Sequence, residues 1–77
     1  MADKLKAQAR VILKRLGDSE GSFFFHVMAV NKLGFDRCYG LASHALLMHR
    51  EGRIRTTAPR YYNGCVMKEI KLRKPKV

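Results

Sequence analysis

The fold of this chain depends most on residues 33–54, which read LGFDRCYGLASHALLMHREGRI. At 100° per residue, an ideal helix over this stretch separates two sets of side chains onto opposite sides. The first set is Cys38, Leu41, Ala45 and Met48, and the second is Tyr39, Gly40, Ser43, Leu47 and Arg50. We therefore predict a tight turn at Gly34, a helix over residues 36–51, a stop at Gly52 and then a strand. The first set belongs to the core, and the second is free to contact a partner.

Length and charge narrow the functions that the chain can perform. Its 77 residues make one domain with a thin core, which leaves little room for a deep catalytic cleft, so we expect a binding protein and not an enzyme. The 16 Lys and Arg residues outnumber the 6 Asp and Glu residues and give a net charge of +10. This excess predicts an anionic partner. Nucleic acid is the leading candidate because its dense phosphates release counterions on binding, while an anionic membrane or an acidic protein also fits the charge alone.

The amino-terminal sequence predicts a cytoplasmic protein. Residues 1–10 read MADKLKAQAR and are charged where a secretory signal turns apolar, and no stretch approaches the roughly 20 apolar residues of a membrane span. We therefore expect no membrane partner. In that compartment Cys38 and Cys65 stay reduced, so no disulfide is predicted.

Metal-ligating and catalytic residue types are present, but their spacing does not suit a site. The possible zinc ligands are Cys38, His44, His49 and Cys65. On a helix, His44 and His49 point about 140° away from each other, and the sequence contains no C-x-x-C or H-x-x-x-H pair. No Ser, His and Asp grouping and no phosphate-cradling glycine loop is recognisable. We predict no metal, no cofactor and no catalytic residue.

A first helix is predicted over residues 3–16, where apolar residues recur at helical spacing and Gly17 marks the end. After a polar connection over residues 17–22, apolar residues are nearly continuous from 23 to 30, which fits either a buried strand or a helix. We favour a helix from about Ser22, because Ser is a good N-cap and the segment continues beyond usual strand length. A short extended piece at 23–24 before the helix is a compromise between the two readings.

Residues 53–72 have the character of a β-hairpin, because β-branched residues and period-two alternation flank a stretch rich in turn residues. Two registers are open, a two-residue turn at 63–64 or a longer loop over 59–64. We favour the longer loop because Pro59 cannot donate to a strand ladder. The predicted fold class is α+β, three helices followed by a hairpin, in a domain over residues 1–72 with a basic tail over 73–77.

This order of elements resembles the winged helix-turn-helix family. The segment HALLMHREGRI is similar to the end of a winged-helix recognition helix, with Ala45 and Met48 as the apolar pair and Gly52 and Ile54 leading into the first wing strand. The small size and basic charge are similar to those of phage or prophage regulators. The resemblance implies a transcriptional regulator of a bacterial or phage-infected cell that binds duplex DNA in a sequence-directed way. Helix 36–51 would enter the major groove, and the 53–72 wing would contact the backbone or the minor groove.

The predicted DNA-binding residues divide between that helix and the wing. They are Arg37, Tyr39, Gly40, Ser43 and His44 on the helix, and Arg53, Arg55, Arg60, Tyr61 and Asn63 in the wing. Arg37 suits a phosphate or a guanine edge, Tyr39 a thymine methyl or a phosphate, and the wing arginines suit phosphates. A glycine inside a helix lowers helix stability by about 1 kcal/mol relative to alanine. At Gly40 the absence of a side chain would allow the helix backbone to approach DNA closely. The structural alternatives are a surface pair of Arg37 with Asp36 and cross-strand packing of Tyr61 with Tyr62.

Two other kinds of partner stay open at the level of sequence. An acidic protein surface would suit the charge, and Leu46 and Leu47 beside Tyr39 would supply an apolar patch for such a partner or for a homodimer. RNA is the other alternative. Because the major groove of duplex RNA is too deep and narrow for a helix, an RNA-binding protein would use the wing and the basic amino-terminal helix.

Overall fold

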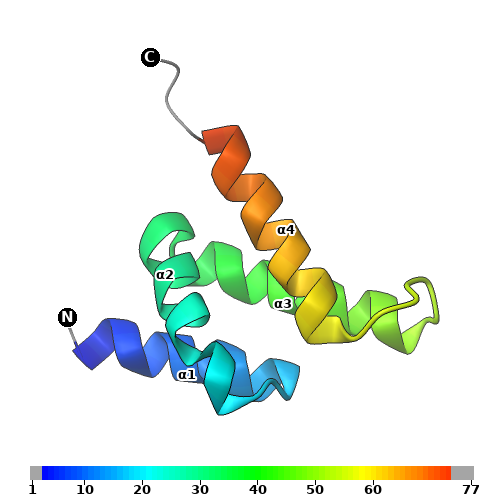
Figure 1. Cartoon of the computed structure of the whole chain (residues 1–77), viewed down its shortest axis with the longest axis horizontal. Coiled ribbons are helices and arrows are strands. Elements are labelled where there is room, and N and C mark those ends of the chain that lie inside the picture. Colours follow the sequence, from blue (N-terminus) through cyan, green and yellow to red (C-terminus); the bar gives the residue numbers. More distant parts are fainter. Residues whose placement is uncertain (1–2, 74–77) are drawn as a thin grey trace.

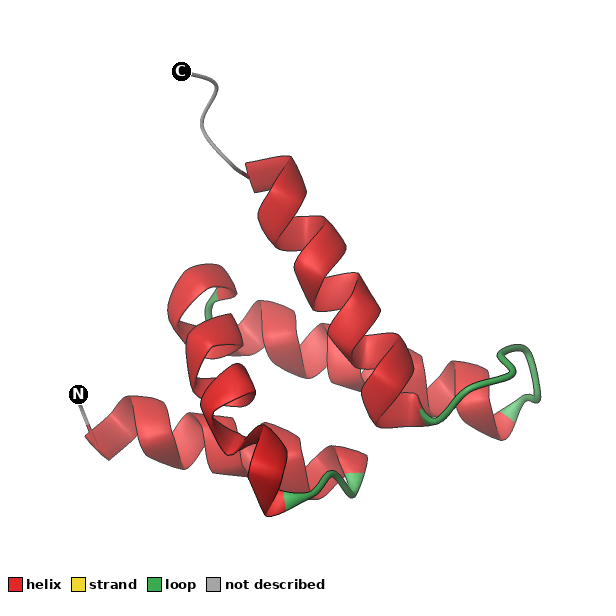
Figure 2. Cartoon of the chain, in the orientation of Figure 1, coloured by secondary structure: helices red, strands yellow, loops and turns green. Residues whose placement is uncertain are grey.

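The protein is a small assembly of helices in the computed structural model, which describes residues 3–73 (Figure 1). The elements are α1 (Asp3–Leu16), a short 3₁₀ turn η1 (Glu20–Ser22), α2 (Phe23–Leu33), α3 (Phe35–Arg50) and α4 (Ala58–Arg73). No strand occurs among the described residues (Figure 2). The predicted α+β fold class is therefore wrong, and the winged arrangement that the resemblance implied is wrong with it.

The first three helices follow the sequence patterns. The helix predicted over residues 3–16 is confirmed, and its buried side chains are Ala9, Ile12, Leu13 and Leu16. The run after Ser22 is helical from its first phenylalanine, so both the strand alternative and the extended piece at 23–24 are wrong. The 11 residues of α2 form three helical turns, and one face of the helix is buried. Of its three phenylalanines, Phe24 is exposed and the other two are half-buried.

The turn at Gly34 and the central helix are also confirmed, with the helix beginning one residue earlier than predicted. Gly34 alone separates α2 from α3 and has a φ of 88°, a conformation that side-chain-bearing residues rarely adopt. The joint is shorter than the three to four residues typical of a DNA-binding helix-turn-helix. At the other end, Gly52 at a φ of 68° follows the last turn of α3.

Residues 58–73 form α4 where a hairpin was predicted, so both registers of its turn are wrong. Thr57 caps the helix, because its Oγ1 accepts a hydrogen bond from the Arg60 amide at 3.3 Å. Pro59 lies in the first turn, where its missing amide hydrogen leaves no helical bond unmade. Ala58, Tyr62 and Val66 are buried at intervals of four residues, and this helical spacing begins before the predicted loop and ends in the predicted second strand.

All four helices contribute to one core. α2 packs on α1, and α4 crosses α3 before its carboxyl-terminal end extends away from the other helices (Figure 1). The largest fully buried side chains include Tyr62 from α4, Ile12 from α1 and His26 from α2. Tyr62, predicted as a possible cross-strand partner of Tyr61, is instead a core residue that lies against the His26 ring, with centroids 5.6 Å apart.

A hydrogen bond fixes the connection between α1 and α2 to this core. His26 Nε2 lies 2.8 Å from Asp18 Oδ2, and the His26 side chain is only 1% exposed. This contact satisfies one nitrogen of the buried imidazole, while Nδ1 has no partner within the described part of the chain. The connection over residues 17–22 is thereby held against the protein although its own residues are mostly polar.

The predicted basic tail over residues 73–77 is described only at its first residue. Arg73 belongs to the last turn of α4, and residues 74–77 of the predicted basic tail lie outside the described residues.

Within residues 3–73, no helix combines the length and the apolar character required to cross a bilayer.

Candidate functional site

The outward face of α3 is open to solvent and has basic side chains beside it. Its buried face consists of Cys38, Leu41, Ala42 and Ala45, which confirms the predicted core side apart from the half-buried Met48. The opposite face, which we call the α3 ridge, consists of Asp36, Tyr39, Gly40, Ser43 and Leu47. Ser43 is half-buried and the others are exposed. The ridge is therefore accessible along about three turns.

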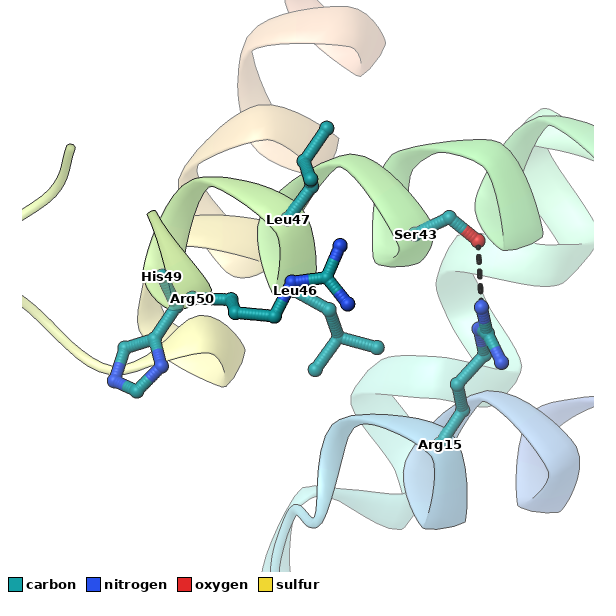
Figure 3. A pocket seen from close by; sticks show the side chains of 6 residues that line it. All are labelled: Arg15, Ser43, Leu46, Leu47, His49 and Arg50. Atoms are coloured by element: carbon teal, nitrogen blue, oxygen red, sulfur yellow. Dashed lines mark hydrogen bonds between the residues drawn. The ribbon is translucent and has the colours of Figure 1, made fainter. Parts of the chain in front are cut away.

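Arg15 of α1 flanks one side of the ridge. Its Nη2 donates a hydrogen bond to Ser43 Oγ at 3.2 Å, and its guanidinium carbon lies 4.7 Å from the centre of the Tyr39 ring. These two contacts hold the guanidinium against α3 at the surface. The adjoining pocket, which we call the α1–α3 pocket, is lined by Arg15, Ser43, Leu46, Leu47, His49 and Arg50 (Figure 3).

The other side of the ridge borders a groove between α3 and α4. This groove, which we call the α3–α4 groove, is lined by Arg37, Gly40, Leu41, His44, Cys65, Lys68, Glu69 and Leu72. His44 Nε2 and Tyr61 Oη share a hydrogen bond of 3.3 Å, and their rings lie 5.8 Å apart. This contact connects the middle of α3 to the first turns of α4, so Tyr61 helps to fix the groove.

Arg37 is fixed by an ion pair across this groove. Its Nε and Nη2 donate to the two carboxylate oxygens of Glu69 at 2.9 and 3.1 Å, and Arg73 Nη2 donates to the same carboxylate at 3.3 Å. The hydrogen bond from Arg37 is the main cause that lowers the pKa of Glu69, and the same bond raises the pKa of Arg37. Arg37 therefore pairs with Glu69 and not with its neighbour Asp36, and this pair occupies its Nε donor and one Nη2 donor.

The structure separates the ten predicted DNA-binding residues into three groups. Tyr39, Gly40 and Ser43 lie on the ridge, whereas Arg37, His44 and Tyr61 lie in or beside the α3–α4 groove. The remaining four are Arg53, Arg55, Arg60 and Asn63, all of them exposed. Arg53 and Arg55 belong to the connection between α3 and α4, and Arg60 and Asn63 belong to α4. The wing on which these four residues and Tyr61 were predicted does not exist among the described residues.

Three cations beside the ridge were not among the predicted site residues: Arg15, Arg50 and Lys68. Arg15 was missed because its helix looks solvated in sequence, and only the packing of α1 on α3 brings it to Tyr39 and Ser43. The angular count already placed Arg50 on the outward face of the helix, which was a usable signal. Lys68 was assigned to a strand, and only the helical form of α4 brings it to the groove.

Positive charge is unevenly compensated over the described surface. The arginines in ion pairs with acidic residues are Arg10, Arg37, Arg53 and Arg73. The other ten Lys and Arg side chains among residues 3–73 have no such pair. Four of the six acidic residues are engaged, counting the Asp18 contact with His26. The molecule therefore presents a surplus of free cations and few free carboxylates.

Within residues 3–73, no three His, Cys, Asp or Glu side chains are grouped so that they could hold a metal ion. Comparison of the chain with protein-family models, with curated proteins and with solved structures finds no match.

Proposed function

We propose that the protein binds duplex DNA with the α3 ridge in the major groove. A helix with its side chains is about 10–12 Å across, and the major groove of B-form DNA is about 12 Å wide. The two phosphate backbones border that groove. The observation that carries the proposal is the placement of cations beside the ridge, with Arg15 and Arg50 on one side and Lys68 on the other. A ridge with positive charge on both sides suits a groove with negative charge on both sides.

Sequence-directed binding, as expected of a transcriptional regulator, would come from the ridge itself. Tyr39 offers its hydroxyl group to base edges, whereas its ring and the Ser43 hydroxyl group already contact Arg15. Arg37, the base-reading residue expected from the sequence, would first have to leave Glu69. Its role in this proposal is to hold α4 beside the ridge, which positions Lys68.

Gly40 provides the test of close docking. It lies on the ridge in the interior of α3, and a Cβ built there would meet nothing within 4 Å. Gly40→Ala should therefore raise the free energy of unfolding by about 0.5–1 kcal/mol, because alanine favours the helix. If the ridge backbone lies against DNA, the added methyl group should nevertheless weaken binding. Gly64→Ala is the matched control, since Gly64 is also exposed, helical and free of nearby atoms, but belongs to α4.

The experiment measures affinity for a random-sequence duplex by fluorescence anisotropy, at salt concentrations from about 50 to about 200 mM. We expect a steep loss of affinity with salt, weaker binding by Gly40→Ala and unchanged binding by Gly64→Ala. Urea unfolding of both variants checks that each is at least as stable as the parent protein. Equal affinities for Gly40→Ala and Gly64→Ala would contradict docking of the ridge.

Alternative partners give different outcomes in the same experiment. Because a helix does not enter the narrow major groove of duplex RNA, equal binding of duplex RNA and duplex DNA would contradict the proposal. Absence of DNA binding at the lowest salt concentration would leave an acidic protein as the partner that suits the charge. The composition of the ridge supports DNA over an acidic protein, because the polar residue Ser43 lies between its exposed apolar side chains Tyr39 and Leu47.

A further inference from the structure

We propose that the α1–α3 pocket is a phosphate-binding site, in which Arg15 and Arg50 together hold one phosphodiester group of the nucleic-acid backbone. The inference rests on the proposed function and deepens it, because it assigns one particular backbone contact. Neither arginine was among the ten predicted DNA-binding residues, although the angular count had placed Arg50 on the outward face of its helix. The pocket lies at the carboxyl-terminal ends of α1 and α3, beside the last turn of the ridge helix (Figure 3).

The first argument is the direction of the two guanidinium groups. Figure 3 shows Arg15 extending from α1 toward Ser43, and Arg50 extending from α3 over Leu46 toward the same space. A guanidinium presents several N–H donors in a planar fork that matches the oxygens of a phosphate. Arg15 uses Nη2 to bind Ser43, which leaves other donors for a ligand. Two such groups that face one space can hold an anion from two sides.

The second argument is that the pocket contains no acidic side chain. Its six lining residues include two arginines and His49 but neither Asp nor Glu. Within residues 3–73, neither Arg15 nor Arg50 takes part in an ion pair, in contrast to Arg10, Arg37, Arg53 and Arg73. Two cations at one site repel each other unless an anion lies between them. An external phosphate would supply the missing negative charge.

The third argument is that Arg15 is held in place before any ligand binds. It lies on the Tyr39 ring and donates to Ser43, so two contacts restrict a side chain that is otherwise among the most flexible. Restriction in the free protein lowers the entropic cost of binding. Ser43 Oγ also remains able to donate its own hydrogen to a phosphate oxygen. The pocket thus combines charge, donors and a preset geometry.

The test compares two double variants with the same loss of charge. Arg15→Gln with Arg50→Gln removes both guanidinium groups of the pocket, whereas Lys32→Gln with Lys71→Gln removes two exposed cations from α2 and α4. Affinity for a duplex is measured against salt concentration. Loss of one phosphate contact should reduce the slope of log K against log salt by about 0.9. For the pocket variant we also expect a loss of affinity of about tenfold or more, and for the control a change of less than about twofold.

Each outcome bears on a separate claim. If the two double variants lose affinity and slope equally, binding depends on diffuse charge and the phosphate site is wrong, while DNA binding itself stands. If the unaltered protein binds no duplex, the proposed function fails first. Because Arg15 also connects α1 to α3, unfolding is measured for every variant, and Arg15→Lys is included as a charge-preserving change. It should recover only part of the affinity because lysine lacks the planar fork. Full recovery by lysine would contradict a two-sided clamp.

Discussion

Burial of two ionisable side chains makes the stability of the folded protein depend on pH. Cys38 and Tyr62 are fully buried, and this burial raises the pKa of the Cys38 thiol and of the Tyr62 phenol. Each group is therefore held neutral in the folded protein at a pH where it already ionises in the unfolded chain. Their contribution to stability is fully present below the unfolded pKa values, about 8.5 for cysteine and about 10 for tyrosine. It is lost as pH rises from those values toward the raised folded values.

We accordingly predict that the urea midpoint falls between about pH 7.5 and about pH 9.5, because the unfolded state releases the Cys38 proton first. Cys38→Ala is the informative variant. Alanine leaves a small cavity and lowers stability at every pH, but it removes the share of the pH dependence that belongs to this thiol. A parent protein whose midpoint is unchanged over this range, or a variant with the same slope as the parent, would show that Cys38 is not the group responsible.

At the scale of elements, the start of α4 is fixed by two hydrogen bonds to Thr57. Thr57 accepts a hydrogen bond from the Arg60 amide through its side chain and one from the Tyr61 amide through its carbonyl oxygen. Thr57→Ala removes the first of these and should lower the free energy of unfolding by about 1 kcal/mol. Thr57→Ser keeps the hydroxyl group and should stay close to the parent protein. Urea unfolding of the two variants checks the cap, and equal losses for alanine and serine would contradict it.

The same element explains where prediction from sequence fails. The helices α1, α2 and α3 were predictable because Gly17, Gly34 and Gly52 follow their last turns. For α1 and α3 the spacing of apolar residues also marked one buried face, whereas the continuous apolar run of α2 did not distinguish a helix from a strand. In α4 the Asn63–Gly64 pair and Pro59 are strong turn signals, and they outweighed the spacing of the residues that become buried. Tertiary burial of Tyr62 and Val66 overrides the local preference of Asn and Gly.

The candidate site was predictable only where it depends on a single helix. Angular spacing alone identifies Tyr39, Gly40 and Ser43 as outward-facing, and the structure agrees. Glu69, the partner of Arg37, lies 32 residues away in sequence, and Ser43, which accepts a hydrogen bond from Arg15, lies 28 residues away, so local pattern carries no information about either contact. The ridge could therefore be predicted from the sequence. The cations on its two sides could not, because only the packing of α1 and α4 against α3 brings Arg15 and Lys68 there.

At the scale of the whole molecule, charge opposes the compact state. The net charge is +10, and ten Lys and Arg side chains of the described residues lie outside ion pairs. Most of these side chains are on the surface, where they repel one another over distances of about 10 Å at 0.1 M salt. The ion pairs that do exist are exposed or partly exposed, and each contributes little to stability. Repulsion should therefore outweigh attraction among the surface charges.

Moderate salt should for this reason stabilise the protein and not destabilise it. We predict that Tm rises by several degrees as NaCl is raised from about 10 to about 100 mM, because screening removes more repulsion than attraction. Lys32→Glu combined with Lys71→Glu lowers the net charge of +10 by four at exposed positions on α2 and α4, and should flatten this rise. A Tm that falls with NaCl would mean that the ion pairs around Glu20 and Glu69 dominate. A rise that is as steep in the double variant as in the parent would assign the effect to general salting-out, which does not depend on the charge of the protein.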